Sequence, residues 1–458
     1  MSNEQRIKVL EEKRNKINNV SCSFCTAKWL QTTLLLQNGY NHSCHHPAPH
    51  KIPLQEIEAD PAALHNSKFK KEQRAKMLKG ERPSECGYCW KIEDLDNEYF
   101  SDRHYKTSDN WAWERFEEIA KSNPQDNVYP SYLEVSFSNA CNFACAYCSP
   151  DISSKWMEDV KQNGPYPDGA HNLNYLKKIG KMPYKNSEHN PYVEAFWKWF
   201  PEVLPHLKVL RITGGEPTMS KDLWKLFDYI KEHPQPQLDI AVNTNLGVPT
   251  ELIQRLKENV NAIENSVKQI DIYTSIESIG EQAEYARDGL DYNQWLLNVH
   301  DMLSNTKSKV AIMTTINILS LPTFNEFIIK LMELRSKYNV RLEDNRIPLS
   351  INIMHWPQQL QCTLLNNEDR NMYADTIESN CKKWLKSTLK TEKFGRIYLE
   401  EWDQIQRLCD YLRSNQPAIE QRSKFVRYIQ AYDKRRNKNF TNTFPEYSTL
   451  LKDWQDAQ

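Results

Sequence analysis

Three cysteines stand close together in the chain, as Cys141-x3-Cys145-x2-Cys148. Thiolates at such short spacings are the usual ligands of iron–sulfur clusters. Zinc is the alternative metal, but a structural zinc ion takes four closed ligands and this loop offers three. Three thiolates on one short loop therefore favour a four-iron cluster in which one iron keeps an open position.

A second set of cysteines lies earlier, as Cys25-x18-Cys44 and then Cys86-x2-Cys89. The sequence between the first two predicts a β-hairpin with its turn at Asn38-Gly39, which would bring their thiols together. Cys86 and Cys89 would then close a four-thiolate site. A zinc ion is the alternative to an iron–sulfur cluster here, because paired CxxC halves also bind zinc.

The ligand set of this second site has alternatives in the sequence. Cys22 forms a CxxC pair with Cys25 and could replace it, although Cys25 gives the better hairpin register. The nearby histidines, His42, His45 and His46, would suit a zinc site. The isolated cysteines Cys362, Cys381 and Cys409 are interpreted as buried apolar side chains.

The elements that must position these cysteines repeat along the chain from about 130 to 356. Short apolar, β-branched runs alternate with longer stretches of helical periodicity. The expected strands are 132–137, 209–213, 238–242, 269–276, 310–316 and 349–354, and the expected helices are 221–232, 251–261, 280–303 and 324–338. This alternation predicts a parallel sheet, open or curled into a partial barrel. A polar insertion, about 149–190, follows the first strand.

Residues that could bind a ligand or take part in a reaction follow several of the expected strands. The first strand precedes the cysteine loop, the second precedes Gly214–Pro217, and the third and fourth end in 243–245 and 274–277. Helix capping or turn formation would explain any one of these. Because the carboxyl ends of parallel strands meet at one edge, their joint placement predicts a site there.

These motifs together resemble the radical S-adenosylmethionine (radical SAM) superfamily. The resemblance is carried by CxxxCxxC after the first strand, by Tyr147 before its last cysteine, and by the GGE sequence at 214–216. It implies that Cys141, Cys145 and Cys148 ligate a [4Fe–4S] cluster whose open iron binds S-adenosylmethionine. It further implies reductive cleavage of that cofactor to a 5′-deoxyadenosyl radical, which abstracts hydrogen from a substrate, with electrons from a small donor such as flavodoxin or ferredoxin.

The same resemblance implies cofactor contacts by residues at the strand ends. GGE would hold the amino group of S-adenosylmethionine, since a carboxylate suits an ammonium and glycine allows close approach. The other implied contacts are Tyr147 near the adenine, Ser275 and Glu277 near the ribose or the methionyl carboxylate, and Asn245 in a similar position. Arg287 is interpreted either as a partner of the cofactor carboxylate or as an ordinary surface charge on a helix. The catalytic residues toward the substrate are not predicted.

The N-terminal cysteines resemble the opening of SPASM and twitch domains, which bind auxiliary clusters. The matching pattern is C-x13-G-x4-C, through Gly39, followed by CxxC. Such modules usually follow the barrel, whereas this one precedes it. Because no cysteine lies between Cys89 and Cys141, the resemblance implies one auxiliary cluster and two [4Fe–4S] clusters in total.

Composition excludes several classes of protein. The chain has 458 residues, 39% hydrophobic and 26% charged, with 12 glycines and a net charge of -1. It is therefore neither collagen-like nor globally basic, and nucleic acid is not an expected partner. Its charged first residues and the absence of long apolar runs predict neither a signal peptide nor a membrane span, hence a cytoplasmic protein with reduced thiols.

The sequence thus predicts an α/β oxidoreductase with three parts: a twitch-like auxiliary domain at 1–128, a partial (β/α)6 barrel at 129–360 and a helical region at 361–458. The expected substrate is a peptide, a protein or a small molecule. The alternative is a non-catalytic, zinc-stabilised scaffold or a nucleic-acid-binding protein. In the helical region, Phe425, Ile429 and Tyr432 form a packing stripe. The basic run 434–438 is interpreted as a solvated helix end or as a contact for nucleic acid or an acidic partner.

Overall fold

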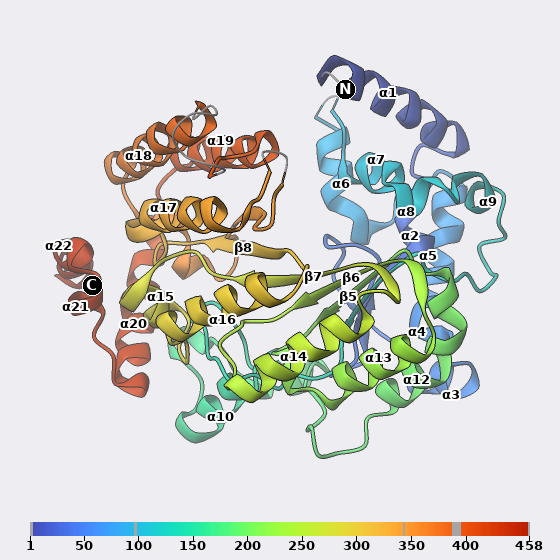
Figure 1. Cartoon of the computed structure of the whole chain (residues 1–458), viewed down its shortest axis with the longest axis horizontal. Coiled ribbons are helices and arrows are strands. Elements are labelled where there is room, and N and C mark those ends of the chain that lie inside the picture. The colour runs from blue at the N-terminus through green and yellow to red at the C-terminus, as the bar shows by residue number, and fades with distance from the viewer. Residues whose placement is uncertain (1–2, 96–98, 342–343, 387–394, 457–458) are drawn as a thin grey trace.

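The computed structural model describes residues 3–95, 99–341, 344–386 and 395–456. One nine-stranded sheet runs through it, in the order β3-β2-β1-β4-β5-β6-β7-β8-β9 (Figure 1). The last six strands are β4 (Tyr132–Ser136), β5 (Val209–Thr213), β6 (Gln235–Asn243), β7 (Val267–Ser275), β8 (Val310–Ile316) and β9 (Leu349–Ile353). They are parallel and follow chain order. The predicted α/β fold class, a partial (β/α)6 barrel, is confirmed.

Helices connect these strands, as β-helix-β crossovers require. They are α12 (Pro191–Val203), α13 (Lys221–Glu232), α14 (Thr250–Ile263), α15 (Gly280–Ala286), α16 (Tyr292–Asn305) and α17 (Leu321–Tyr338), with short turns η3 (Leu204–His206) and η4 (Pro217–Met219). In Figure 1, α13, α14 and α16 lie in front of the sheet. The helix predicted over 280–303 is two helices, because the chain breaks at Gly289, whose φ is +105°.

The insertion after β4 carries three short helical segments. It contains α10 (Ser154–Asn163), η2 (Pro167–Gly169) and α11 (Leu173–Lys178). The side chain of Ser153 accepts a hydrogen bond from the Trp156 amide and so caps α10. The cysteine loop therefore lies between the end of β4 and the start of α10.

The N-terminal segment contributes strands to the same sheet. The predicted hairpin is present: β1 (Gln31–Leu35) pairs with β2 (Tyr40–His42), and Gly39 takes a positive φ of 70° at the turn. β2 pairs in turn with β3 (His50–Lys51), while β1 runs parallel to β4 with Thr33 opposite Glu134. The expected division between 128 and 129 therefore separates two segments whose strands are hydrogen-bonded to each other.

Short helices complete the N-terminal segment around a small apolar core of its own. The core includes Ile17, Phe24, Trp29, Leu30 and Phe116, all buried. The helices are α1 (Asn3–Val20), α2 (Ala27–Leu30), α3 (Leu54–Ala59), α4 (Ala63–Asn66), α5 (Lys68–Leu78), η1 (Ser84–Cys86), α6 (Gly87–Glu93), α7 (Asp102–Ser108), α8 (Asn110–Trp113) and α9 (Phe116–Ala120).

The C-terminal region is helical, as predicted, and packs against α17, β9 and the insertion helix α10. It comprises η5 (Gln358–Leu360), η6 (Cys362–Leu364), α18 (Asn367–Lys386), α19 (Leu399–Ser414), η7 (Ile419–Gln421), α20 (Arg422–Arg436), α21 (Phe440–Thr443), η8 (Pro445–Tyr447) and α22 (Ser448–Asp456). Figure 1 shows α18 and α19 next to α17, and α20 lower in the view, toward α10. Phe425, Ile429 and Tyr432 are buried, so the predicted packing stripe is confirmed.

Candidate functional site

A cavity of about 270 Å³ opens at the carboxyl ends of β4 to β7. Its lining includes Cys141, Cys145, Tyr147, Cys148, Thr213, Gly214, Gly215, Asn243, Asn245, Ser275 and Arg287. The structure thus brings the three cysteines of the loop together with most of the predicted strand-end residues. Two predicted cofactor contacts, Glu216 and Glu277, do not line the cavity. Burial raises the pKa of Cys141 to about 12 and also raises the pKa values of Cys145 and Cys148.

Glycines allow the neighbouring loops to close tightly on the cysteine loop. A Cβ atom at Gly215 would lie 2.3 Å from the Ala140 carbonyl oxygen, and one at Gly247 would lie 2.3 Å from the Phe143 ring. At Gly289 it would lie 2.8 Å from another carbonyl oxygen of the same loop. Backbone oxygens close the space at Gly215 and Gly289, so glycine is required there. At Gly247 a side chain would have to displace the buried Phe143 ring. The sequence analysis missed Gly247 and Gly289, which are isolated glycines in turns.

The backbone around Cys145 is fixed by hydrogen bonds on both sides. The amides of Ala144 and Ala146 donate to the carbonyl oxygens of Asp288 and Ala286, each at 2.8 Å. The Cys145 carbonyl oxygen accepts from the indole N–H of Trp156 at 2.8 Å. The turn between α15 and α16 and the insertion helix α10 therefore position this cysteine together.

Helix α20 supplies further donors to this loop. The Tyr428 hydroxyl donates to the Ala146 carbonyl oxygen, and the Tyr432 hydroxyl lies 3.4 Å from the Ala144 carbonyl oxygen. Burial raises the pKa values of both tyrosines well above their usual range, which keeps them protonated as donors. The C-terminal region thus contacts the cysteine loop directly, a role that the sequence analysis missed.

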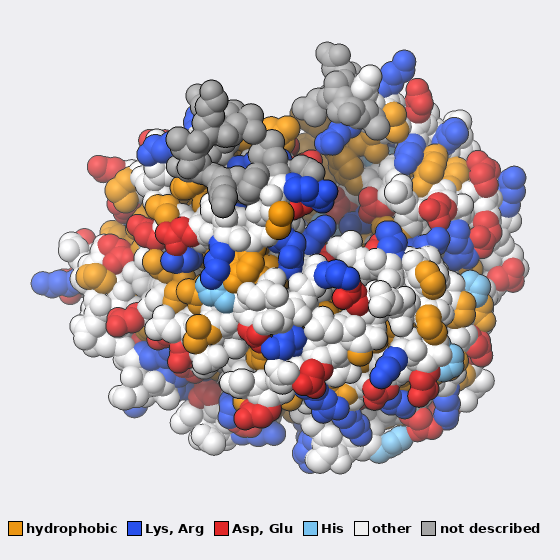
Figure 2. Space-filling model, in the orientation of Figure 1, with side chains coloured by type: hydrophobic (Ala, Val, Ile, Leu, Met, Phe, Trp, Pro, Cys, Tyr) orange, Lys and Arg blue, Asp and Glu red, His pale blue; other side chains and the backbone are white. Residues whose placement is uncertain are grey.

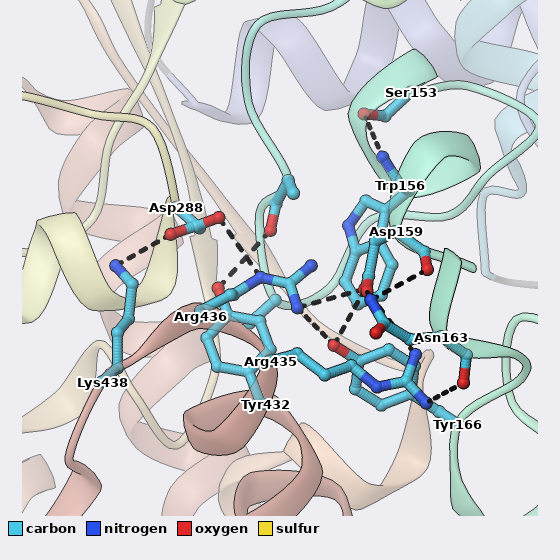
Figure 3. Close-up of polar contacts among 12 residues, drawn as sticks. Ser153, Trp156, Asp159, Asn163, Tyr166, Asp288, Tyr432, Arg435, Arg436 and Lys438 are labelled. Atoms are coloured by element: carbon cyan, nitrogen blue, oxygen red, sulfur yellow. Dashed lines mark hydrogen bonds and ion pairs between the residues drawn. The ribbon is translucent and has the colours of Figure 1, made fainter. Parts of the chain in front are cut away.

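Three cations of the basic run at the end of α20, Arg435, Arg436 and Lys438, pair with acids of the same chain, whereas Lys434 is exposed. Figure 3 shows the Arg436 guanidinium between Asp159 and Asp288, with ion-pair distances of 3.2 Å to each, and it lies over the Trp156 ring. Lys438 also pairs with Asp288, at 3.1 Å. The prediction of a solvated helix end is therefore wrong for Arg436 and Lys438, which pair with acids of the insertion and of the turn before α16. The i, i+4, i+8 spacing of Tyr428, Tyr432 and Arg436 is the sequence signal that could have revealed this face.

A buried triad lies under the cavity wall. The Glu277 carboxylate, which is fully buried, accepts from the Tyr147 hydroxyl at 2.7 Å and pairs with the Arg287 guanidinium at 2.6 Å. Arg287 also lies 4.0 Å from the Cys145 sulfur and faces the Tyr147 ring. Arg287 is therefore not a surface charge. Glu277 does not line the cavity itself but fixes the positions of Tyr147 and Arg287, which do.

Glu216 joins two of the loops that form the cavity. One carboxylate oxygen accepts from the amide of Thr218 at 3.0 Å and from its hydroxyl at 2.8 Å, and the other accepts from the Asn245 amide at 2.7 Å. Burial raises the pKa of Glu216. The carboxylate thus connects the turn after β5 to the turn after β6, and the wall here is the backbone of Gly214 and Gly215. The direct contact expected between this carboxylate and the cofactor's amino group stays a prediction.

This geometry predicts the effect of Glu216→Gln. The new side-chain NH2 would face the backbone N–H of Thr218 or Asn245, and that hydrogen bond would be lost. We therefore expect a loss of about 1–3 kcal/mol in the free energy of unfolding. Denaturant titration measures this loss, with the exposed Glu251→Gln on α14 as the control. Unchanged stability together with weaker S-adenosylmethionine binding would instead support a direct contact with the ammonium.

The four N-terminal cysteines line a second, small cavity. Cys25, Cys44, Cys86 and Cys89 all border it, whereas Cys22 is exposed and its thiol lies 3.3 Å from the Gly80 carbonyl oxygen. Burial raises the pKa values of Cys44 and Cys89 to about 12, so thiolates here need a strong counter-charge.

The three histidines near this cavity are placed differently from one another. His46 borders the cavity, but its ring pairs with Asp102 at 2.6 Å and stacks on Tyr88. His42 contacts the Cys44 carbonyl oxygen, and His45 is exposed. Within the described ranges, no three His, Cys, Asp or Glu side chains are placed so that they could hold a metal ion. The assignment of both cysteine sets to clusters therefore stays a prediction.

Comparison with known proteins matches residues 135–334 to the radical SAM superfamily. GTP 3′,8-cyclases from Sulfurimonas denitrificans, Klebsiella pneumoniae and Campylobacter lari are 24%, 30% and 28% identical over 207, 141 and 127 residues. These matches cover 45%, 31% and 28% of this chain and 52%, 35% and 31% of the relatives. The chain thus spans between about a third and a half of the length of the curated relatives that it matches.

Two further observations bear on the class of protein. No helix among the described residues is both long and apolar enough to cross a membrane. On the face shown in Figure 2, basic and acidic side chains are interspersed. The match over residues 135–334, the parallel sheet and the cavity at its carboxyl edge agree with one another. Residues 135–334 therefore form a radical SAM domain.

Proposed function

We propose that the protein cleaves S-adenosylmethionine reductively and abstracts a hydrogen atom from a substrate. One observation carries this proposal: three thiols and the backbone of two consecutive glycines face one cavity at the carboxyl edge of the sheet. A [4Fe–4S] cluster with one open iron and S-adenosylmethionine fit this donor set. When bound, they supply the 5′-deoxyadenosyl radical.

The residues around the cavity have distinct tasks in this proposal. Cys141, Cys145 and Cys148 bind the cluster, while Gly214 and Gly215 let the cofactor approach the backbone. Arg287 places a positive charge beside Cys145, where it favours the anionic thiolate. Ser275, Asn245 and Tyr147 present polar groups to the cofactor from the neighbouring strand ends.

We further propose that Cys25, Cys44, Cys86 and Cys89 bind an auxiliary [4Fe–4S] cluster. Their joint placement around one cavity supports this, as does the exclusion of Cys22 from it. All four iron positions would be ligated by the protein, so this site would leave no iron open for S-adenosylmethionine.

Metal analysis tests both assignments. We expect anaerobically reconstituted protein to hold about eight irons, as two four-iron clusters, and to form 5′-deoxyadenosine with S-adenosylmethionine and dithionite. Four irons with one zinc would refute the auxiliary cluster alone. Colourless, zinc-containing protein without 5′-deoxyadenosine would support the alternative of a non-catalytic scaffold.

The substrate is a peptide, a protein or a small molecule in this proposal. GTP is the first small molecule to test, because the relatives are named GTP 3′,8-cyclases. Anaerobic incubation with GTP, and separately with fractions of host-cell extract, would be followed by mass spectrometry, with flavodoxin or ferredoxin as the electron donor. Loss of GTP that depends on S-adenosylmethionine would assign a nucleotide substrate, and a mass change in a protein fraction would assign a protein.

A further inference from the structure

Three cationic side chains are buried near the four N-terminal cysteines; Lys28 lines their cavity, whereas Lys70 and Arg74 lie outside its lining. Lys28, Lys70 and Arg74 are exposed by only 2%, 1% and 0%. Lys28 borders the cavity, forms an ion pair with Glu85 and reaches the Cys86 thiol. Of the three cations, it is the one with a carboxylate partner in the described chain.

Lys70 and Arg74 contact neutral groups. The Lys70 ammonium lies 3.2 Å from the Gln31 carbonyl oxygen and 2.8 Å from Nδ1 of His65. The Arg74 guanidinium donates to the Lys28 carbonyl oxygen at 3.2 Å and to the Asn66 side chain at 2.9 Å. Neither cation forms an ion pair with an acid anywhere in the described ranges.

The imidazole between these two cations supplies no negative charge. His65 is fully buried, and Nε2 lies 3.1 Å from Arg74 and 2.6 Å from the Trp29 carbonyl oxygen. Burial and the two cations lower the pKa of His65 well below its usual value, so the ring is neutral. His42 and His50, which also face Lys70 and Lys28, have pKa values lowered mainly by burial. These three histidines therefore do not balance the positive charges of Lys28, Lys70 and Arg74.

Buried charges are costly unless an opposite charge pairs with them. The Arg74 guanidinium cannot avoid this cost by losing its proton. Burial lowers the pKa of Lys70 well below its usual value, so a nearby anion is what would hold its ammonium charged. The thiols are the remaining source of negative charge: Cys86 and Cys44 interact electrostatically with Lys28, and Cys44 also with Lys70. A metal centre with four thiolates would carry the negative charge that this layer of cations lacks.

We propose that Lys28, Lys70 and Arg74 are the counter-charges of an anionic metal–thiolate centre at Cys25, Cys44, Cys86 and Cys89, and that they raise its reduction potential. This inference rests on the proposed auxiliary cluster. Reduction adds a negative charge to a cluster, so fixed cations nearby stabilise the reduced form. The auxiliary cluster would therefore be easier to reduce than it would be without these cations.

Redox titration of the reconstituted full chain, followed by electron paramagnetic resonance, tests this inference. In Lys70→Met the midpoint potential of the auxiliary cluster should shift to a lower value, while that of the barrel cluster should stay unchanged. Lys70→Arg keeps the charge and should keep the wild-type potential. Lys68→Met, an exposed position at the start of the same helix α5, is the matched control.

The outcomes separate this inference from the proposal beneath it. Eight irons with an unshifted auxiliary potential in Lys70→Met would overturn the counter-charge role. If that variant does not load the cluster, Lys28→Met must show the downward shift instead, and an unshifted potential there would also overturn it. Four irons in the wild type would contradict the auxiliary cluster itself.

Discussion

Cys145→Ala is expected to abolish the formation of 5′-deoxyadenosine. Cys145 stands at the centre of the cysteine loop, with its neighbours hydrogen-bonded on both sides and the Arg287 guanidinium 4.0 Å from its sulfur. Removing this thiol leaves two ligands, which cannot hold a four-iron cluster with one open position. Anaerobic assay with S-adenosylmethionine and dithionite, with the product quantified by mass spectrometry, measures the loss.

Cys22→Ala is the matched control for this experiment. Its thiol is exposed, lies outside both cavities and contacts the Gly80 carbonyl oxygen. This variant should retain both the iron content and the yield of 5′-deoxyadenosine of the wild type. A Cys145→Ala protein that still forms the product would remove the cysteine loop from the proposed reaction.

Much of the barrel could be predicted because its signals are local. The apolar runs of β5 and β8 fall on the expected residues, and α13 begins and ends as predicted, with Ser220 as its N-cap. The hairpin turn at Asn38-Gly39 is equally local, because Gly39 supplies the positive φ that the turn requires. In each case the deciding residues lie within one element.

What could not be predicted depends on partners that are distant in the chain. The pairing of β1 with β4 leaves no trace in either strand's own pattern, so the N-terminal segment was expected as a separate domain. The Glu216 motif shows a carboxylate but does not show that its oxygens accept from Thr218 and Asn245, because those donors lie in turns after two different strands. The basic end of α20 was misread for the same reason, since its acids lie in the insertion and in the turn before α16.

Arg436→Met is expected to lower the free energy of unfolding by about 1.5–3 kcal/mol, the scale for hydrogen bonds to charged groups, because Arg435 and Lys438 remain beside the two acids. The Arg436 side chain is exposed by 6%, and its removal would leave Asp159 and Asp288 without this partner. Methionine keeps much of the apolar stem, so the loss reports the charge more than the packing. Denaturant titration of the variant and the wild type under identical anaerobic conditions measures the difference.

The control lies on the same helix. Arg427 pairs with Asp168 at 2.8 Å, but its side chain is exposed by 39%, so Arg427→Met should cost at most about 1 kcal/mol. Arg436→Met should also release iron from the barrel cluster to a chelator faster than Arg427→Met does, because α20 carries the tyrosines that contact the carbonyl oxygens of Ala144 and Ala146. Equal losses of stability and equal iron release in the two variants would show that α20 packs on the barrel without supporting the cysteine loop.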